Sequence, residues 1–166
     1  MERQIQASSM QWYTDGSKTP EGIGAGVHGP RLKLSVPMGV YPSIFQAEVY
    51  AISLCAEINL RRNYRNESIL IMSDSQAALK ALLSFEVKSS LVLECIDKLN
   101  ALAEYNDIQL TWVPGHVGVV GNEEADRLAR MAAASLPIGP EPFIAIGPST
   151  IKEELRKERN TVRNQH

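Results

Sequence analysis

Four acidic residues occupy positions where a solvent-exposed charge would be unusual. They are Asp15 at the end of a predicted strand, Glu48 beside the apolar stripe of a predicted helix, Asp74 directly after an apolar strand, and Asp126 among apolar residues of a later helix. In an open α/β sheet the ends of neighbouring strands meet at one edge, which predicts that Asp15 and Asp74 are neighbours. Helices packed over that edge could add the other two carboxylates.

Clustered carboxylates indicate a cation site, because like charges a few ångströms apart cannot all ionise unless a positive charge neutralises them. Oxygen ligands suit Mg²⁺ or Mn²⁺, whereas zinc prefers the histidine and cysteine ligands that this set lacks. Two such ions about 4 Å apart activate water and stabilise the leaving oxygen of a phosphodiester. A single aspartate after a strand, such as Asp74, is more often a turn former or helix cap, so only the convergence of all four predicts phosphoryl chemistry.

The elements that would position these residues follow from hydrophobic periodicity and turn residues. We expect strands at 10–15, 23–28, 32–36, 68–73 and 108–113, and helices at 43–62, 78–83, 92–103 and 122–134. The Asp-Gly-Ser sequence at Asp15 reads as a turn that ends the first strand, and Gly29-Pro30 as the turn of a hairpin. Three sequential antiparallel strands followed by alternating helices and strands predict an α/β fold with a mixed sheet.

Composition limits the class of protein. The chain has 166 residues, of which 44% are hydrophobic, so it can bury the core of one domain. Cys55 and Cys95 lie on apolar helix faces, which favours buried thiols over a disulfide or a metal framework and predicts a reducing compartment. No apolar run is long enough to cross a bilayer, and residues 1 to 10 lack a signal peptide's apolar segment, so we expect an intracellular protein in cytoplasm or nucleus, with no membrane partner.

The chain divides into a tail at 1–9, a domain at 10–134 and a tail at 135–166. The last tail begins with a segment rich in proline and glycine, which is typical of a linker, and continues as a charged segment with a thin apolar stripe. It could connect the domain to a neighbour or simply be disordered. The formal net charge of −2 does not decide the partner, because bound cations would reverse the local field at an acidic site.

Four local strings resemble motifs of the type 1 ribonuclease H family, in that family's order. They are YTDGS around Asp15, QAEVYAI around Glu48, SDSQAAL around Asp74 and WVPGHVGVVGNEEADRLA, which contains His116 and Asp126. The resemblance covers residues 10 to 134. Four motifs in register are highly specific, whereas each carboxylate alone is not.

The resemblance implies an RNase H-like fold, with a five-stranded mixed sheet flanked by helices. It implies that two Mg²⁺ ions, for which Mn²⁺ would substitute, are bound by Asp15, Glu48, Asp74 and Asp126, with Asp15 shared. It also implies hydrolysis of the RNA strand of RNA–DNA hybrids, leaving 5′-phosphate and 3′-hydroxyl ends, with His116 assisting from a mobile loop. On the residues alone, an exposed loop histidine between glycines is the commoner explanation of His116.

Substrate contacts carry over less directly. Gly16 and Ser17 could offer backbone and hydroxyl groups to the RNA strand, Gln76 could reach the minor groove, and Asn122 could bond near the cleavage position. The RNA 2′-hydroxyl separates RNA from DNA, so short polar groups would select the strand.

Two departures from the family put part of the hybrid contact in doubt. Ile44 and Phe45 stand where the family commonly has polar residues that touch the hybrid, and residues 84–91 lack the basic, tryptophan-containing protrusion of bacterial members. Fewer phosphate contacts predict weaker binding. The chain in this respect resembles ribonuclease H domains of retroelement polyproteins that borrow affinity from an attached reverse transcriptase. Together with the QAEVYAI string, this favours a non-LTR retrotransposon origin.

Two other classes of function remain open at this stage. A catalytically weak RNase H-like module could serve hybrid or protein binding, although such a module would normally have lost a carboxylate. A related DNA-cutting nuclease such as an integrase shares the sheet, but the HVGVVGNEEAD segment argues against it. The oligomeric state is open.

Overall fold

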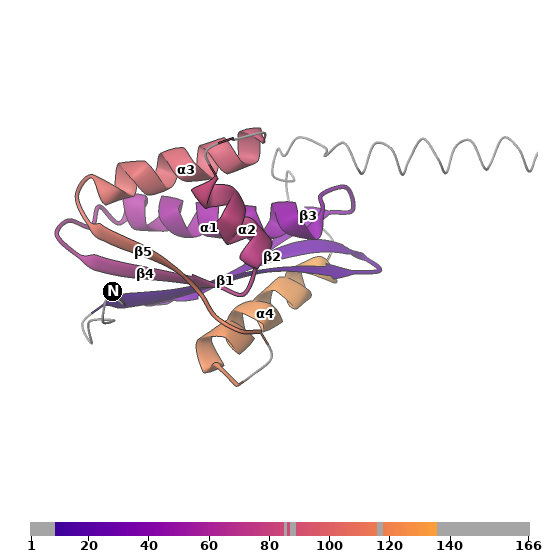
Figure 1. Cartoon of the computed structure of the whole chain (residues 1–166). Helices are drawn as coiled ribbons and strands as arrows, with labels where there is room; N and C mark the ends of the chain where they lie inside the picture. Colours follow the sequence, from indigo (N-terminus) through magenta and orange to yellow (C-terminus); the bar gives the residue numbers. More distant parts are fainter. Residues whose placement is uncertain (1–8, 85, 87–88, 116–117, 136–166) are drawn as a thin grey trace, which may run out of the picture.

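A mixed sheet with helices on both faces organises the chain in a computed structural model, which describes residues 9–84, 86, 89–115 and 118–135 (Figure 1). The elements are β1 (Met10–Thr19), β2 (Gly22–Gly29), β3 (Leu32–Gly39), α1 (Ile44–Arg61), β4 (Ser68–Ser73), α2 (Gln76–Leu83), α3 (Ser90–Ala103), β5 (Asp107–Trp112) and α4 (Val120–Ala133). His116 and the predicted tail beyond residue 135 lie outside the described residues. None of the described helices is both long and apolar enough to cross a membrane.

The sheet has the strand order β3-β2-β1-β4-β5. β1 and β3 are antiparallel to β2, while β4 is parallel to both β1 and β5. This arrangement confirms the predicted five-stranded mixed sheet. The helices α1, α2 and α3 cover one face, and α4 covers the other face alone among the described helices (Figure 1).

The face under α1 and α3 carries the main hydrophobic core. Large side chains such as Trp12, Ile52 and Ile71 are fully buried there. α1 starts at a capping box, in which the Ser43 hydroxyl accepts from the Gln46 N–H and the Gln46 side chain accepts from the Ser43 N–H. These contacts fix both the first turn of α1 and its orientation on the sheet.

Both cysteines belong to this same helical layer. Cys55 on α1 and Cys95 on α3 are buried and form no disulfide, as predicted from their positions on apolar faces. Burial raises the pKa of the Cys55 thiol, and it raises the pKa of Cys95 to about 12. Both side chains therefore act as small apolar groups in the core.

The face under α4 is built differently, from small residues that let helix and sheet approach closely. Ala129, Ala132 and Ala133 of α4 lie over β2, and a Cβ atom at Gly24 would stand 2.3 Å from the Ala133 nitrogen. Backbone atoms yield such space only at a cost in free energy, so this strand position favours glycine. The glycines of β2 thus determine how close α4, which carries Asp126, lies to the sheet.

Two boundaries differ from the prediction. Asp15 does not end the first strand, because β1 continues through Thr19 and pairs with β2 along its whole second half. The Asp-Gly-Ser sequence that suggested a turn is extended backbone, since Gly16 lies where α1 presses on the strand. The hairpin between β2 and β3 turns one residue later than predicted, at Pro30 and Arg31, where Arg31 has a φ of 57°.

Candidate active site

The candidate site lies where β4 ends and β1 continues. The parallel pairing of these strands stops at Thr14 and Ser73, so the second half of β1 has no strand on that side. Asp15 follows Thr14, and Asp74 follows Ser73. Side chains from the two faces of the sheet can meet at this opening, which would be impossible in the middle of a continuous sheet.

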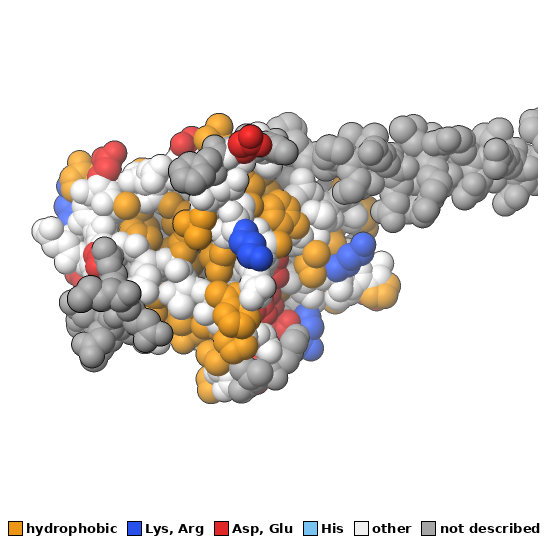
Figure 2. Space-filling model, in the orientation of Figure 1, with side chains coloured by type: hydrophobic (Ala, Val, Ile, Leu, Met, Phe, Trp, Pro, Cys, Tyr) orange, Lys and Arg blue, Asp and Glu red, His pale blue; other side chains and the backbone are white. Residues whose placement is uncertain are grey.

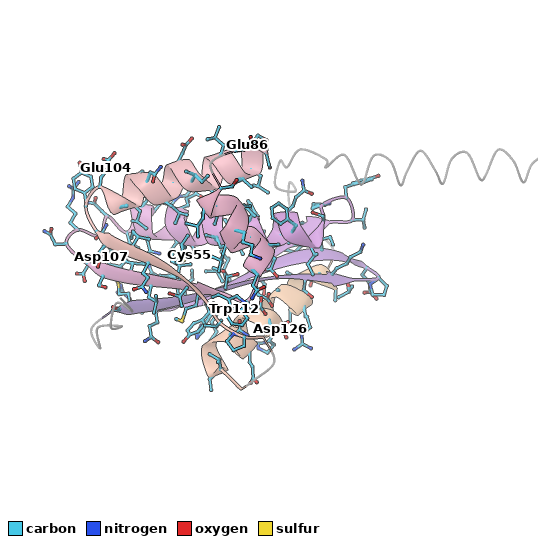
Figure 3. The ribbon with its side chains drawn as sticks, in the orientation of Figure 1. Cys55, Glu86, Glu104, Asp107, Trp112 and Asp126 are labelled. Carbon is cyan, nitrogen blue, oxygen red and sulfur yellow. The ribbon has the colours of Figure 1, made fainter. Side chains whose placement is uncertain are left out.

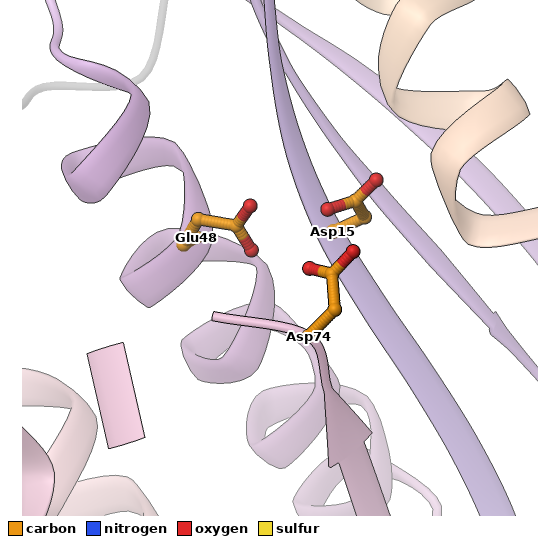
Figure 4. A group of neighbouring side chains, drawn as sticks. All are labelled: Asp15, Glu48 and Asp74. Carbon is orange, nitrogen blue, oxygen red and sulfur yellow. The ribbon is translucent and has the colours of Figure 1, made fainter. Parts of the chain in front are cut away.

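Three carboxylates converge in this opening. One oxygen each of Asp15, Glu48 and Asp74 lies within 4.8 Å of the other two (Figure 4). The side chains come from β1, from α1 and from the end of β4, and they point toward one another in the close-up. The predicted neighbourhood of Asp15 and Asp74, and the addition of Glu48 from a covering helix, are confirmed in position.

Glu48 is held in place by the strand against which it packs. A Cβ atom at Gly16 would stand 2.7 Å from the Glu48 nitrogen, so the glycine permits α1 to touch β1 here. The Gly16 N–H donates to the Glu48 carboxylate. Glu48 is only 7% exposed, and its Oε2 atom is buried with no hydrogen-bond partner within the described part of the chain. An unpaired buried carboxylate oxygen is costly unless a cation or donor completes it.

Asp74 is fixed by the segment that follows β5. The Trp112 indole Nε1 donates to the Asp74 carbonyl oxygen at 3.2 Å, and the Val113 N–H donates to the Ser73 carbonyl at 2.9 Å. A Cβ atom at Gly115 would stand 2.9 Å from the Asp74 Oδ2 atom. The WVPG string therefore packs around Asp74 and keeps its carboxylate directed into the opening.

Asp126 reaches the same site from the opposite face of the sheet, where it projects from α4 (Figure 3). It lies within hydrogen-bonding distance of Asp15 but outside the compact set of three. Its Oδ2 atom pairs with the Nε atom of Arg130 at 2.9 Å, one helical turn further along. All four predicted carboxylates thus line one cavity. Asp126, the fourth of them, already forms an ion pair with the Arg130 side chain.

The cavity has a volume of about 460 Å³. In the space-filling view, acidic side chains lie in a recess between apolar and basic side chains (Figure 2). The lining residues are Asp15, Gly16, Ser17, Lys18, Ile44, Glu48, Asp74, Asp126 and Arg130. The cavity is therefore an open, mainly acidic recess with two cationic side chains.

Burial and mutual repulsion make two of the carboxylates weak acids. Burial, together with the charges of Glu48 and Asp74, raises the pKa of Asp15 to about 10. Burial also raises the pKa of Glu48 to about 7, against the lowering effect of its hydrogen bonds with Asp15 and the Gly16 N–H. The metal-free cluster holds its charge poorly, which is the behaviour expected of a site designed around cations.

The donor set fits a hard divalent cation. The three converging groups supply only carboxylate oxygens, and the Glu48 Oε2 atom is buried without a hydrogen-bond partner among the residues that the structure describes. Mg²⁺ and Mn²⁺ prefer such ligands, whereas a zinc site would contain sulfur or nitrogen donors.

The predicted substrate-contacting residues separate into two groups. Gly16 and Ser17 line the cavity, while Gln76 and Asn122 do not. Gln76 is exposed as the first residue of α2, and Asn122 is 3% exposed with an Oδ1 atom that has no partner within the described ranges. Substrate contacts by these residues stay predictions.

Ile44 and Phe45 lie in different environments. Ile44 is 50% exposed and lines the cavity, whereas Phe45 packs against the hydrophobic core. Of these two departures from the family pattern, Ile44 is therefore the one that changes the chemistry of the cavity.

Two cationic residues of the cavity were missed by the sequence analysis. Arg130 follows Asp126 by four residues, a spacing that brings side chains together on a helix and could have revealed it. Lys18 follows Asp15 by three residues in β1. No sequence signal identifies Lys18, because the strand was predicted to end before it.

The fold and site together define an α/β domain with a cluster of carboxylates where the parallel pairing of its central strands ends. The family comparison agrees with this class. Residues 7–134 match the RNase H family model, and the chain belongs to the RNase H family.

Curated relatives point the same way. The chain is 30% identical to human Ribonuclease H1 over 141 residues, which cover 73% of this chain and 49% of the relative. It is 32% identical over 89 residues to Ribonuclease H of Tropheryma whipplei (strain Twist), covering 46% of this chain and 55% of the relative. A 39-residue segment is 49% identical to Ribonuclease H of Methylorubrum extorquens (strain PA1), which is 24% of this chain and 17% of that protein. The chain spans about half the length of the Ribonuclease H1 proteins it matches.

Proposed function

We propose that this domain is an endoribonuclease that hydrolyses the RNA strand of RNA–DNA hybrids with two bound Mg²⁺ ions. The observation that carries the proposal is the convergence of Asp15, Glu48 and Asp74 at the end of β4 in a chain of the RNase H family. The names of the relatives support the substrate class. Products would carry 5′-phosphate and 3′-hydroxyl ends.

The residues divide the work by their position. Asp15, Glu48 and Asp74 would hold the cations, with Asp15 shared, and Asp126 would complete the ligand set from α4. The bound ions supply an activated water and stabilisation of the leaving oxygen. Gly16 fixes the Glu48 carboxylate through its N–H, which limits the freedom of a ligand that must not move during the reaction.

Recognition of the RNA strand would fall to short polar groups at the cavity. Ser17 lies two residues after Asp15 in β1 and lines the cavity, which supports a role for its hydroxyl in contacting a 2′-hydroxyl near the cleavage position. Gln76 and Asn122 would contact the hybrid outside the cavity. His116, which the structure does not describe, is proposed to assist proton transfer or product release.

The decisive experiment is incubation of the domain with an end-labelled hybrid in EDTA and in Mg²⁺. Cleavage of the RNA strand in Mg²⁺ only, with duplex DNA left intact, is the expected result. Asp15→Asn should abolish cleavage, while Asp97→Asn, which changes an exposed carboxylate of α3, should not. Wild-type cleavage by the Asp15→Asn variant would refute the metal assignment.

We further propose that the domain works inside the cell within a larger reverse-transcribing polyprotein of the non-LTR retrotransposon type. The support is the short connection between α2, which ends at Leu83, and α3, which begins at Ser90, because it leaves no room for a basic protrusion. Attaching a reverse transcriptase domain should then lower the KM for hybrid and, by adding phosphate contacts, steepen the fall of log affinity with log salt. An unchanged KM would remove the support for this partner.

A further inference from the structure

Arg130 stands at the cavity without an obvious structural role. It belongs to the last turns of α4, its side chain is 62% exposed, and it lines the acidic recess. Its ion pair within the described residues is with Asp126, at 2.9 Å from Nε to Oδ2. Exposed pairs of this spacing contribute little to stability, so folding alone does not explain an arginine here.

The partner of Arg130 is itself needed for another task. Asp126 is the predicted fourth cation ligand, so a divalent ion would compete with the Arg130 guanidinium for the Asp126 carboxylate. A cation bound to this carboxylate would weaken its pair with the guanidinium. The guanidinium then remains at the cavity rim as a free positive charge with several N–H donors.

The charge balance of the cavity shows where such a group would be used. Four ionised carboxylates are balanced by two divalent cations, but a bound phosphodiester adds one further negative charge. Arg130 and Lys18 are the cationic residues that line the cavity. Arginine binds phosphate oxygens through paired N–H groups, which gives both affinity and orientation.

We propose that Arg130 is a substrate-binding residue that exchanges partners, pairing with Asp126 in the metal-free domain and with the hybrid's phosphate backbone once Asp126 binds a cation. The inference rests on the proposed function, because it takes an RNA–DNA hybrid as the ligand. It assigns to α4 a contact that compensates in part for the phosphate contacts that a missing protrusion cannot make.

The experiment compares Arg130→Ala and Arg130→Lys with Arg127→Ala. Arg127 is a matched control, because it is an exposed arginine of the same helix that pairs with Glu124 at 2.6 Å but does not line the cavity. Three quantities are measured for each full-length variant: Mg²⁺ affinity of the free domain by calorimetry, hybrid affinity in Ca²⁺ by fluorescence anisotropy at several salt concentrations, and KM and kcat in Mg²⁺.

The partner exchange predicts changes of opposite sign in Arg130→Ala. Mg²⁺ affinity should rise about twofold because a competitor is gone. Hybrid affinity should fall about tenfold, KM should rise correspondingly, and the slope of log affinity against log salt should decrease by about one. Arg130→Lys should keep the salt slope, and Arg127→Ala should match the wild type in all three measurements.

Two results would overturn the proposal. Hybrid affinity and salt slope equal to those of Arg127→Ala would show that Arg130 does not touch the substrate. A fall in Mg²⁺ affinity would show that Arg130 orients Asp126 for the cation instead of competing with it. A wild-type domain that binds hybrid but does not cleave it in any divalent ion would refute the proposed function, and the anisotropy comparison would still decide the role of Arg130.

Discussion

The two faces of the sheet each contribute one helix-borne carboxylate to the same cavity, and they do so in different ways. Glu48 comes from α1, is nearly buried, and accepts the Gly16 N–H. Asp126 comes from α4 and is held by Arg130, whose side chain is mostly exposed. One carboxylate is fixed by the core, and the other is fixed by a contact that water can reach.

The helices that carry these residues differ in the same sense. α1 begins at a complete capping box and contributes large buried side chains of its own, such as Ile52, to the core. α4 begins at Val119 without a side-chain cap and packs through alanines on the glycines of β2. The α1 face is stabilised by filled volume, whereas the α4 face depends on the absence of side chains. We infer that Glu48 is the rigid half of the site and Asp126 the adjustable half.

The largest expected effect tests this division directly. Glu48→Gln should reduce hybrid cleavage by about 10³-fold, since a buried member of the compact ligand set loses its charge, which corresponds to about 4 kcal/mol. Asp126→Asn should cost only about 10- to 100-fold, because Asp126 lies outside the compact set and its amide keeps a ligand oxygen. Initial rates at saturating Mg²⁺ measure both, with Glu57→Gln on α1 as control. Equal losses would mean that the α4 carboxylate is no less essential.

The two faces of the sheet should lose stability through opposite changes in side-chain volume. The α1 face should be sensitive to the removal of a side chain, and the α4 face to the addition of one. Ile52→Ala removes a fully buried side chain from the α1 face and should destabilise the domain by about 3 kcal/mol. Gly24→Ala adds one methyl group to the α4 face and should destabilise it by about 2 kcal/mol, because the new Cβ meets backbone atoms of α4. Denaturant unfolding measures both. A gain in stability from Gly24→Ala, as strand propensity alone would give, would contradict the close approach.

The α1 face was also the more predictable one from sequence. The helical stripe from Ala47 to Ile58 and the apolar strand before Asp74 place two carboxylates correctly, because 3.6-residue and strand periodicities report directly on burial. The four motifs then fix their order in the fold. The mixed sheet and the convergence of Asp15, Glu48 and Asp74 follow from these signals together.

The packing of the α4 face was harder to predict from the sequence, because it depends on glycine positions that have no side chain. Glycine at position 24 lowers strand propensity, and nothing in the sequence tells that a helix backbone fills the space. The Asp-Gly-Ser sequence around Gly16 is typical of a turn, so the end of the first strand was predicted wrongly. In the structure this sequence is extended strand that lies under α1. That misplaced strand end hid Lys18, and the exposed Ile44 could not be told from the core-packed Phe45 beside it.

The pH dependence should reveal the buried half of the site. Asp15 and Glu48 bind a proton more tightly in the folded domain than in the unfolded chain, so low pH favours folding. In EDTA the stabilisation is complete below the unfolded pKa values of about 4, the Glu48 contribution is lost as the pH rises through its folded pKa of about 7, and the Asp15 contribution is lost only as the pH approaches its folded pKa of about 10. The melting temperature should therefore fall between pH 5 and 8, by an amount equivalent to about 2 kcal/mol.

Mg²⁺ is the control for this pH dependence, because a cation takes over the role of the bound protons. In Mg²⁺ the melting temperature should be nearly constant over the same range. Glu124, whose ion-pair partners Arg127 and Lys33 lower its pKa to about 2, acts below this window and with opposite sign. Identical melting curves with and without Mg²⁺ from pH 5 to 8 would contradict a cation site at these carboxylates.

The smallest expected effect concerns the helix starts. Ser43→Ala removes the acceptor for the Gln46 N–H and should destabilise the domain by about 1 kcal/mol. Val119→Ser supplies an acceptor that α4 lacks, at a residue whose extended backbone (φ −74°, ψ 106°) suits a cap, and should stabilise it by about 0.5 kcal/mol. Thermal unfolding at pH 5 in EDTA measures both.

If Val119→Ser stabilises the domain and also slows hybrid cleavage, the uncapped start of α4 is used to let Asp126 adjust. If cleavage is unchanged, the adjustable half of the site is confined to the Asp126 and Arg130 side chains.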